Sequence, residues 1–153
     1  MTTIGDTAAA VGKGLFAGAA GTVAMTVSST IEAKLRDRDS SSAPADAAGK
    51  VLGVQPRDEQ GQTRFSNVVH WSYGTSWGAV RGLLNAAGVD GPPAVLAHFA
   101  AVWGSELVML PSLGVAPPPW ESEPQEIAID AFHHIVYVMA TAAAFAALQR
   151  SSS

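Results

Sequence analysis

Charged residues are spaced unevenly along this chain and leave four long windows that are almost wholly uncharged. Every residue between Lys13 and Glu32 is uncharged. Each of the three later windows contains a single charged residue, namely Arg81, Glu106 or Asp130. A helix that crosses a bilayer needs about 20 predominantly apolar residues, so each window is long enough for one crossing. The pattern predicts helices over residues of about 10–34, 66–88, 92–113 and 126–148.

A soluble four-helix bundle is the alternative fold for four such helices. Its helices would show polar residues along one stripe, recurring about every 3.6 residues. No stripe of charges is present in any of the four windows. Charged residues make up only 14% of the chain, whereas about 25% is usual in soluble domains. We therefore predict an all-α fold, an integral membrane bundle of four transmembrane helices, with residues 1–153 forming a single membrane domain.

A polar loop of residues 35–65 separates the first two predicted spans, and "ADAAGKVLG" within it is a candidate for a short interfacial helix. The loop region is rich in basic residues, which by the positive-inside rule places it in the cytoplasm. The third loop lies on the same side and carries acidic residues, which count little in that rule. The basic residues of the first loop region are Lys34, Arg36, Arg38, Lys50, Arg57 and Arg64.

Composition and motifs exclude several classes of function. The chain has no cysteine, so it has neither a disulfide framework nor a thiolate metal site. Its net charge of -4 provides no basic face for nucleic acid. The segment "MTTIGDTAAAVGKG" lacks the basic region and apolar core of a cleaved signal, so we expect the first span to insert uncleaved. Motifs of nucleophile elbows, phosphate loops and zinc proteases are absent from the sequence, so we identify no catalytic residue, and a metal-dependent membrane enzyme is the third hypothesis after the two non-enzymatic ones.

Glycines at four-residue spacing indicate close packing between helices. Gly14 and Gly18 form one pair, and Gly74, Gly78 and Gly82 form a longer row. Small residues at this spacing let the backbones of membrane helices approach each other. The spacing does not name the partner helix, which could belong to the same chain, to a second copy in a homo-oligomer or to a larger membrane complex.

Ionisable side chains inside the predicted spans are the candidates for function. Such groups cost about 3 kcal/mol each at the bilayer centre and usually face the interior of a bundle. Asp130 and His134 are four residues apart and so share one helix face. We predict that they meet His70 of the second helix and Glu106 of the third. His98, near the start of the third helix, is predicted to lie at the membrane interface.

Three interpretations of this four-residue cluster remain open. The groups could act only as interhelical hydrogen-bonding partners, each bond contributing about 0.6 kcal/mol. They could handle protons or ions, because carboxylates beside imidazoles can titrate near neutral pH. They could also bind a transition metal as a cofactor, since two imidazoles and two carboxylates form a suitable ligand set.

A resemblance to a known family rests mainly on "LPSLGVAPPPWESEPQEIAIDAFHHIVY". This segment resembles the corresponding part of the YagU-like bacterial inner-membrane proteins, and "HWSYG" and "GLFAGAAG" resemble two further family motifs. Two positions depart from the family pattern. Glu106 stands where family members carry histidine, and "RDRDSSSAP" matches the family's Pro-Arg-x-Pro loop only loosely. The matching positions are Pro111, Gly114, Pro117, Pro118, Asp130, Phe132, His134, Val136 and Tyr137, with His70 and Tyr73 in the second helix.

The resemblance implies a multi-pass protein of the bacterial inner membrane whose first loop lies outside, in a family of largely uncharacterised activity. That orientation conflicts with the charge count of the loop, and we slightly favour the family's orientation. Together, these observations predict a small inner-membrane protein that handles protons or ions, in transport or in a response to acid, at a buried histidine–carboxylate cluster. The alternatives are a non-catalytic subunit or scaffold that packs through its glycine rows, and a metal-binding membrane protein.

Overall fold

Four long helices and one short helix make up most of the computed structural model, which describes residues 3–39 and 41–151. In chain order they are α1 (Ile4–Leu35), α2 (Ala43–Leu52), α3 (Glu59–Ala86), α4 (Gly91–Ser112) and α5 (Pro124–Arg150). A single 3₁₀ turn, η1 (Pro119–Glu121), precedes α5. All regular elements of the described residues are helical, as the sequence predicts.

Local sequence signals fix where these helices begin and end. Thr3 and Asp6 form a capping box, in which the Thr3 hydroxyl accepts a hydrogen bond from the Asp6 amide and the Asp6 carboxylate accepts one from the Thr3 amide. The Asp58 carboxylate accepts a 2.7 Å hydrogen bond from the Gly61 amide and starts α3. Gly53, with a φ of 66°, ends α2 in the left-handed conformation that glycine favours.

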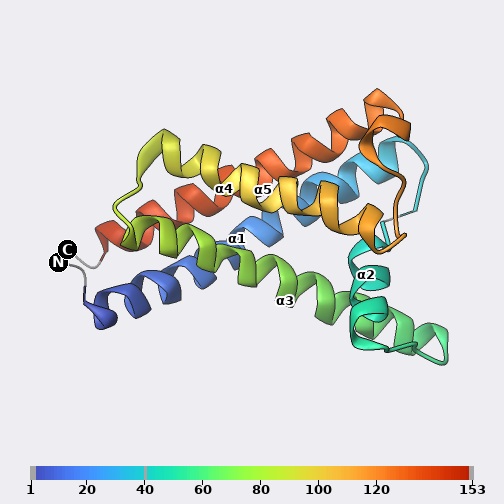
Figure 1. Cartoon of the computed structure of the whole chain (residues 1–153), viewed down its shortest axis with the longest axis horizontal. Coiled ribbons are helices and arrows are strands. Elements are labelled where there is room, and N and C mark those ends of the chain that lie inside the picture. The colour runs from blue at the N-terminus through green and yellow to red at the C-terminus, as the bar shows by residue number, and fades with distance from the viewer. Residues whose placement is uncertain (1–2, 40, 152–153) are drawn as a thin grey trace.

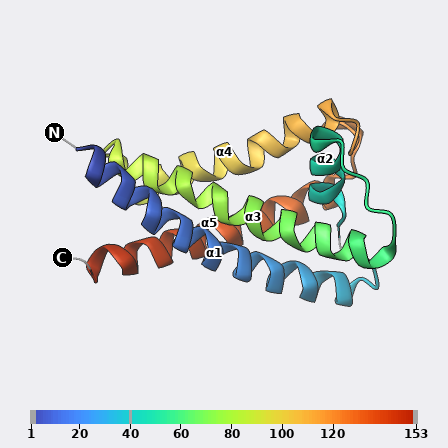
Figure 2. The same ribbon diagram turned by 90° about the horizontal axis from the view of Figure 1, so that it is seen from below.

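The four long helices run alternately in opposite directions (Figure 1). Both termini therefore lie at one end of the bundle, and α2 lies at the other end (Figures 1 and 2). α1 makes its most extensive contacts with α3 and α5, whereas α4 makes far fewer contacts with α3 and α5. The backbone of α1 thus lies close to those of α3 and α5, whereas α4 packs against the bundle through larger side chains such as Val102 and Phe99.

The predicted glycine rows lie at the contact between α1 and α3. A Cβ atom added at Gly18 would lie 2.8 Å from the Gly78 Cα atom, and one added at Gly14 would lie 3.0 Å from the Gly82 amide nitrogen. A Cβ atom added at Gly74 would likewise collide with the side chain of Thr22 on α1. The two rows therefore pack against each other within one chain.

Many large apolar side chains point away from the bundle, while the face that α1 buries consists of small residues. Phe16, Val27, Leu96, Val108 and Met139 are each more than half exposed. The buried residues of α1 are all alanine, glycine or threonine. A water-soluble bundle would place most of its large apolar residues inside, so these exposed residues are consistent with a helix bundle surrounded by lipid.

Three helices of the described residues, α1, α4 and α5, are long and apolar enough to cross a membrane. The fourth predicted span corresponds to α3, which has 28 residues and is long enough but not apolar enough. Its first turns carry Glu59 and Arg64, and Arg81 and Asn85 lie near its end. The structure thus supports a membrane bundle with three apolar spans.

Some predicted boundaries differ from the observed ones. The first loop is shorter than the predicted 35–65, because the candidate interfacial segment forms α2 and because α3 begins at Glu59 rather than near residue 66. Asp58 supplies the cap that starts α3 early. His98 is fully buried between the helices, and its Nε2 lies 3.0 Å from the Trp77 carbonyl oxygen; its position at the membrane interface stays a prediction.

Candidate cation site

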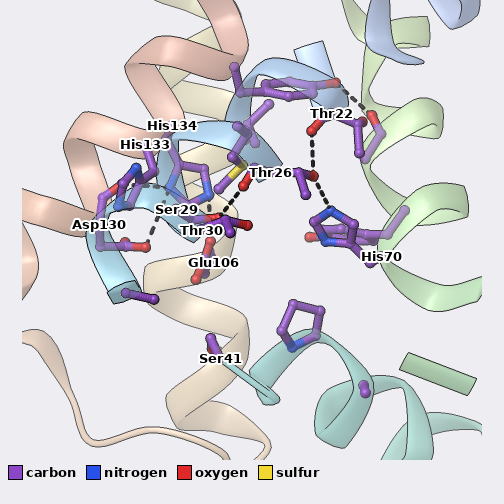
Figure 3. A pocket seen from close by; sticks show the side chains of 18 of the residues that line it. Thr22, Thr26, Ser29, Thr30, Ser41, His70, Glu106, Asp130, His133 and His134 are labelled. Carbon is purple, nitrogen blue, oxygen red and sulfur yellow. Dashed lines mark hydrogen bonds and ion pairs between the residues drawn. The ribbon is translucent and has the colours of Figure 1, made fainter. Parts of the chain in front are cut away.

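A cavity of about 500 Å³ lies between α1, α3, α4 and α5. Ser41, Pro44 and Ala45, from the loop before α2 and from its first turn, line the cavity at the α2 end of the bundle. Thr22 and Tyr137 line it near the middle of the long helices. Figure 3 shows hydroxyl, imidazole and carboxylate groups projecting into it.

Glu106, Asp130 and His134 meet on one side of this cavity. The Glu106 Oε2 atom lies 2.7 Å from the His134 Nε2 atom. One potential ligand atom of each of the three residues lies within 4.8 Å of those of the other two. The His134 side chain is 6% exposed, while Glu106 and Asp130 are partly buried at the cavity wall. α4 supplies one of the three groups and α5 supplies two, one helical turn apart.

The contact of the His134 Nδ1 atom indicates which ring nitrogen carries a hydrogen. The His134 Nδ1 atom lies 2.9 Å from the Asp130 carbonyl oxygen, and a carbonyl oxygen can only accept a hydrogen bond. Nδ1 therefore carries a hydrogen and donates it. In a neutral imidazole Nε2 would then present a lone pair to a Glu106 carboxylate oxygen, so a proton or another cation must lie between these two acceptors.

Asp130 is held in place from α4. The Trp103 indole nitrogen donates a 2.8 Å hydrogen bond to the Asp130 Oδ2 atom, and Trp103 itself stacks on Phe99 at 5.3 Å between ring centroids. The Asp130 Oδ1 atom lies 3.5 Å from the His134 Nδ1 atom. Trp103 did not emerge from the sequence as a site residue, although it lies three residues before Glu106 and so shares its helix face.

His70, the fourth residue of the predicted cluster, does not join the other three. Its Nε2 atom lies 2.8 Å from the Thr26 hydroxyl, which in turn donates to the Thr22 carbonyl oxygen. His70 lies on the opposite side of the same cavity (Figure 3). The predicted four-residue cluster is therefore corrected to a group of three, with His70 facing it across the cavity.

A second polar network, which the sequence did not predict, lies at the α2 end of the cavity. Glu32 accepts hydrogen bonds from Arg36 and Arg38, and Arg36 also pairs with Glu126 at the start of α5. These hydrogen bonds, which Arg36 donates to Glu126 and Glu32 and which Arg38 donates to Glu32, raise the pKa of both guanidinium groups above the ordinary value. The network ties the end of α1 to the start of α5.

His133 connects this network to the bundle interior. Its Nδ1 atom lies 2.8 Å from the Ser28 hydroxyl, and its Nε2 atom lies 3.7 Å from a Glu32 carboxylate oxygen. His133 and His134 thus point to different partners, as adjacent positions on a helix must. The spacing of four between Glu32 and Arg36 was a sequence signal for part of this network.

No protein-family model, curated protein or solved structure matches this chain. The resemblance to YagU-like proteins stays a prediction from short motifs. The site itself is a histidine and two carboxylates, gathered beside a cavity in a bundle with three helices apolar enough to cross a membrane.

Proposed function

We propose that this protein is a multi-pass inner-membrane protein that takes up a cation, in the first instance a proton, between Glu106 and His134. The observation that carries the proposal is the 2.7 Å distance between the Glu106 Oε2 and His134 Nε2 atoms. Two acceptors at this distance hold a cation between them, and the cavity, lined in part by hydroxyl groups, extends from this pair to the α2 end of the bundle.

The depth of the pair within α4 and α5 supports this role. Glu106 lies in the apolar helix α4, and His134 lies in the apolar helix α5. Ionisable groups are costly at membrane depth and are usually retained there for ion or proton pathways. The cavity reaches this pair from one end of the bundle, an arrangement suited to a protein that responds to acid on that side or that opens alternately during transport.

The membrane topology that we propose has four crossings, with α3 as the fourth. α3 is less apolar than the other three, but its glycine row packs on α1, and Ser66, Asn67 and His70 line the cavity, so that these polar groups face the bundle interior. Polar groups in membrane helices are tolerated where they face the bundle interior. The bacterial inner membrane as the location follows from the resemblance to YagU-like proteins.

Single cysteines would test this topology, because the chain contains none of its own. Ser41→Cys lies before α2, and Glu123→Cys lies just before α5; both positions are exposed. With four crossings an impermeant thiol reagent reaches both cysteines from the same side of the membrane. If α3 does not cross, the two cysteines react from opposite sides. The side on which Ser41→Cys reacts also decides between the two predicted orientations of the first loop.

Proton uptake through the pair is tested in vesicles of purified protein that enclose a pH-sensitive dye. We expect an imposed pH gradient to collapse faster than in protein-free vesicles, and Glu106→Gln to lower the protein-dependent rate at least tenfold because the amide cannot exchange a proton. Glu59→Gln makes the same chemical change at an exposed position at the start of α3 and should leave the rate unchanged. Equal rates for the wild type and Glu106→Gln would contradict the proposal.

The scaffold alternative finds no specific support in the arrangement of the helices. Its proposed docking surfaces, the glycine rows of α1 and α3, cover each other within one chain. A partner protein would therefore need another surface, so we do not develop this function further.

A further inference from the structure

We infer that Glu106, Asp130 and His134 bind one divalent first-row transition metal ion of the Mn²⁺ or Zn²⁺ class. The inference rests on the proposed cation site and names a second cation that it would take. A carboxylate from α4 meets a carboxylate and an imidazole from α5, with one potential ligand atom from each within 4.8 Å of the others. Metal sites inside helix bundles are built in this way, from inward-facing side chains of adjacent helices.

The hydrogen bonds around the site prepare these groups for a metal. His134 donates from Nδ1 to the Asp130 carbonyl oxygen at 2.9 Å, which directs the Nε2 atom toward Glu106. Histidine ligands of metals usually donate their other ring nitrogen to a carbonyl or carboxylate in this manner. The Asp130 carboxylate is oriented by a 2.8 Å hydrogen bond from Trp103. Two of the three proposed ligands, His134 and Asp130, are therefore oriented by hydrogen bonds to groups that would not themselves bind the metal.

The charge of the site also favours a divalent ion. When Glu106 and His134 share a proton, their charges cancel and the Asp130 carboxylate keeps a charge of its own. Among the described residues no lysine or arginine forms an ion pair with Asp130 or Glu106. A divalent ion in place of the proton would balance both carboxylates beside a neutral imidazole, which lowers the cost of burying charge.

The ligand types select the class of metal. Imidazole suits zinc, iron, copper and nickel, and carboxylates suit manganese and magnesium. One imidazole with two carboxylates, and no thiolate in a chain without cysteine, favours Mn²⁺ or Zn²⁺ over copper(I). Mg²⁺ prefers oxygen ligands alone and keeps most of its waters, so it should bind more weakly. The cavity beside the three side chains leaves room for water to complete the coordination.

The test is a titration of the full-length, tag-free protein in detergent after treatment with a chelator. We expect isothermal calorimetry to show one site per chain for Mn²⁺ and Zn²⁺, with much weaker binding of Mg²⁺. Glu106→Gln and His134→Gln should each lower the affinity at least tenfold. His70→Gln is the matched control, because it removes an imidazole from the same cavity but outside the cluster, and it should keep the wild-type affinity.

A measurement on the wild type alone keeps the test decisive if these variants fail to fold. Electron spin echo spectroscopy of the Mn²⁺-loaded protein should show coupling to one directly bound imidazole nitrogen, that of His134. Absence of binding, equal affinities in all variants, or absence of nitrogen coupling would each overturn the metal site.

The metal site and the proton site can fail separately. Glu106→Gln vesicles that lose the proton flux, from a protein that binds no metal, would overturn the metal site and leave the proposed function standing. Metal binding by the wild type, together with an unchanged proton flux in Glu106→Gln, would overturn the proposed proton uptake and leave the metal site standing.

Discussion

A Gly78→Ala variant is expected to lose about 3 kcal/mol or more of its free energy of unfolding. The added methyl group would meet the backbone of α1 directly, lying 2.6 Å from the Gly18 Cα atom and close to the Gly14 carbonyl oxygen. Backbone atoms cannot rotate out of the way as a flexible side chain can, so α1 and α3 must separate along their length. Unfolding of the purified protein in mixed micelles, followed by circular dichroism, measures the loss.

Gly104→Ala is the matched control for this experiment. Gly104 lies inside α4, and a Cβ atom added there would have no neighbour within 4 Å. Replacing a helical glycine by alanine at an open position stabilises a helix by about 0.5–1 kcal/mol. The two identical substitutions should therefore have opposite effects. A Gly78→Ala variant as stable as the wild type would contradict the close contact between α1 and α3.

The second large effect is expected at Gly21, where α1 contacts α5. A Cβ atom at Gly21 would lie 2.8 Å from the Tyr137 carbonyl oxygen and would also collide with the Thr141 hydroxyl. Thr141 is fully buried, and its hydroxyl donates a 2.8 Å hydrogen bond to that same carbonyl. We expect Gly21→Ala to cost about 2–3 kcal/mol, within the usual range for overpacking.

The Thr141→Ala substitution should partly rescue Gly21→Ala. It removes the hydroxyl that the new methyl group would strike, while the collision with the Tyr137 carbonyl remains. In a double-mutant cycle we expect a favourable coupling of about 1 kcal/mol between the two positions, within the range for residues in contact. Strictly additive effects would show that the two positions do not touch.

The helices were predictable from the sequence because uncharged windows of this length form few structures other than long apolar helices. α1, α4 and α5 follow directly from these windows. The start of α3 was not predictable from hydrophobicity, since its first turns are polar and the helix begins where Asp58 caps it. The glycine rows predicted close packing of helices. They did not predict that α1 and α3 pack against each other, because the spacing along one helix does not identify the partner helix.

The candidate site was predictable in part. Spacing along one helix placed Asp130 and His134 together, and that pair is observed. Glu106 comes from another helix, whose rotation no local pattern fixes. His70 was placed with these residues, but it lies four residues before Gly74 and so continues the glycine row that faces α1. Its bond to Thr26 follows from that register.

The small number of contacts that α4 makes with the other helices has a consequence for its mobility. α4 makes far fewer contacts with α3 and α5 than α1 makes with α3, so we expect that moving α4 away from the bundle costs less than separating α1 from α3. The interaction between Glu106 and His134 joins α4 to α5. If the site takes up a cation as proposed, loss of that cation would leave two acceptors that repel each other, so we expect occupancy of the site to affect the position of α4.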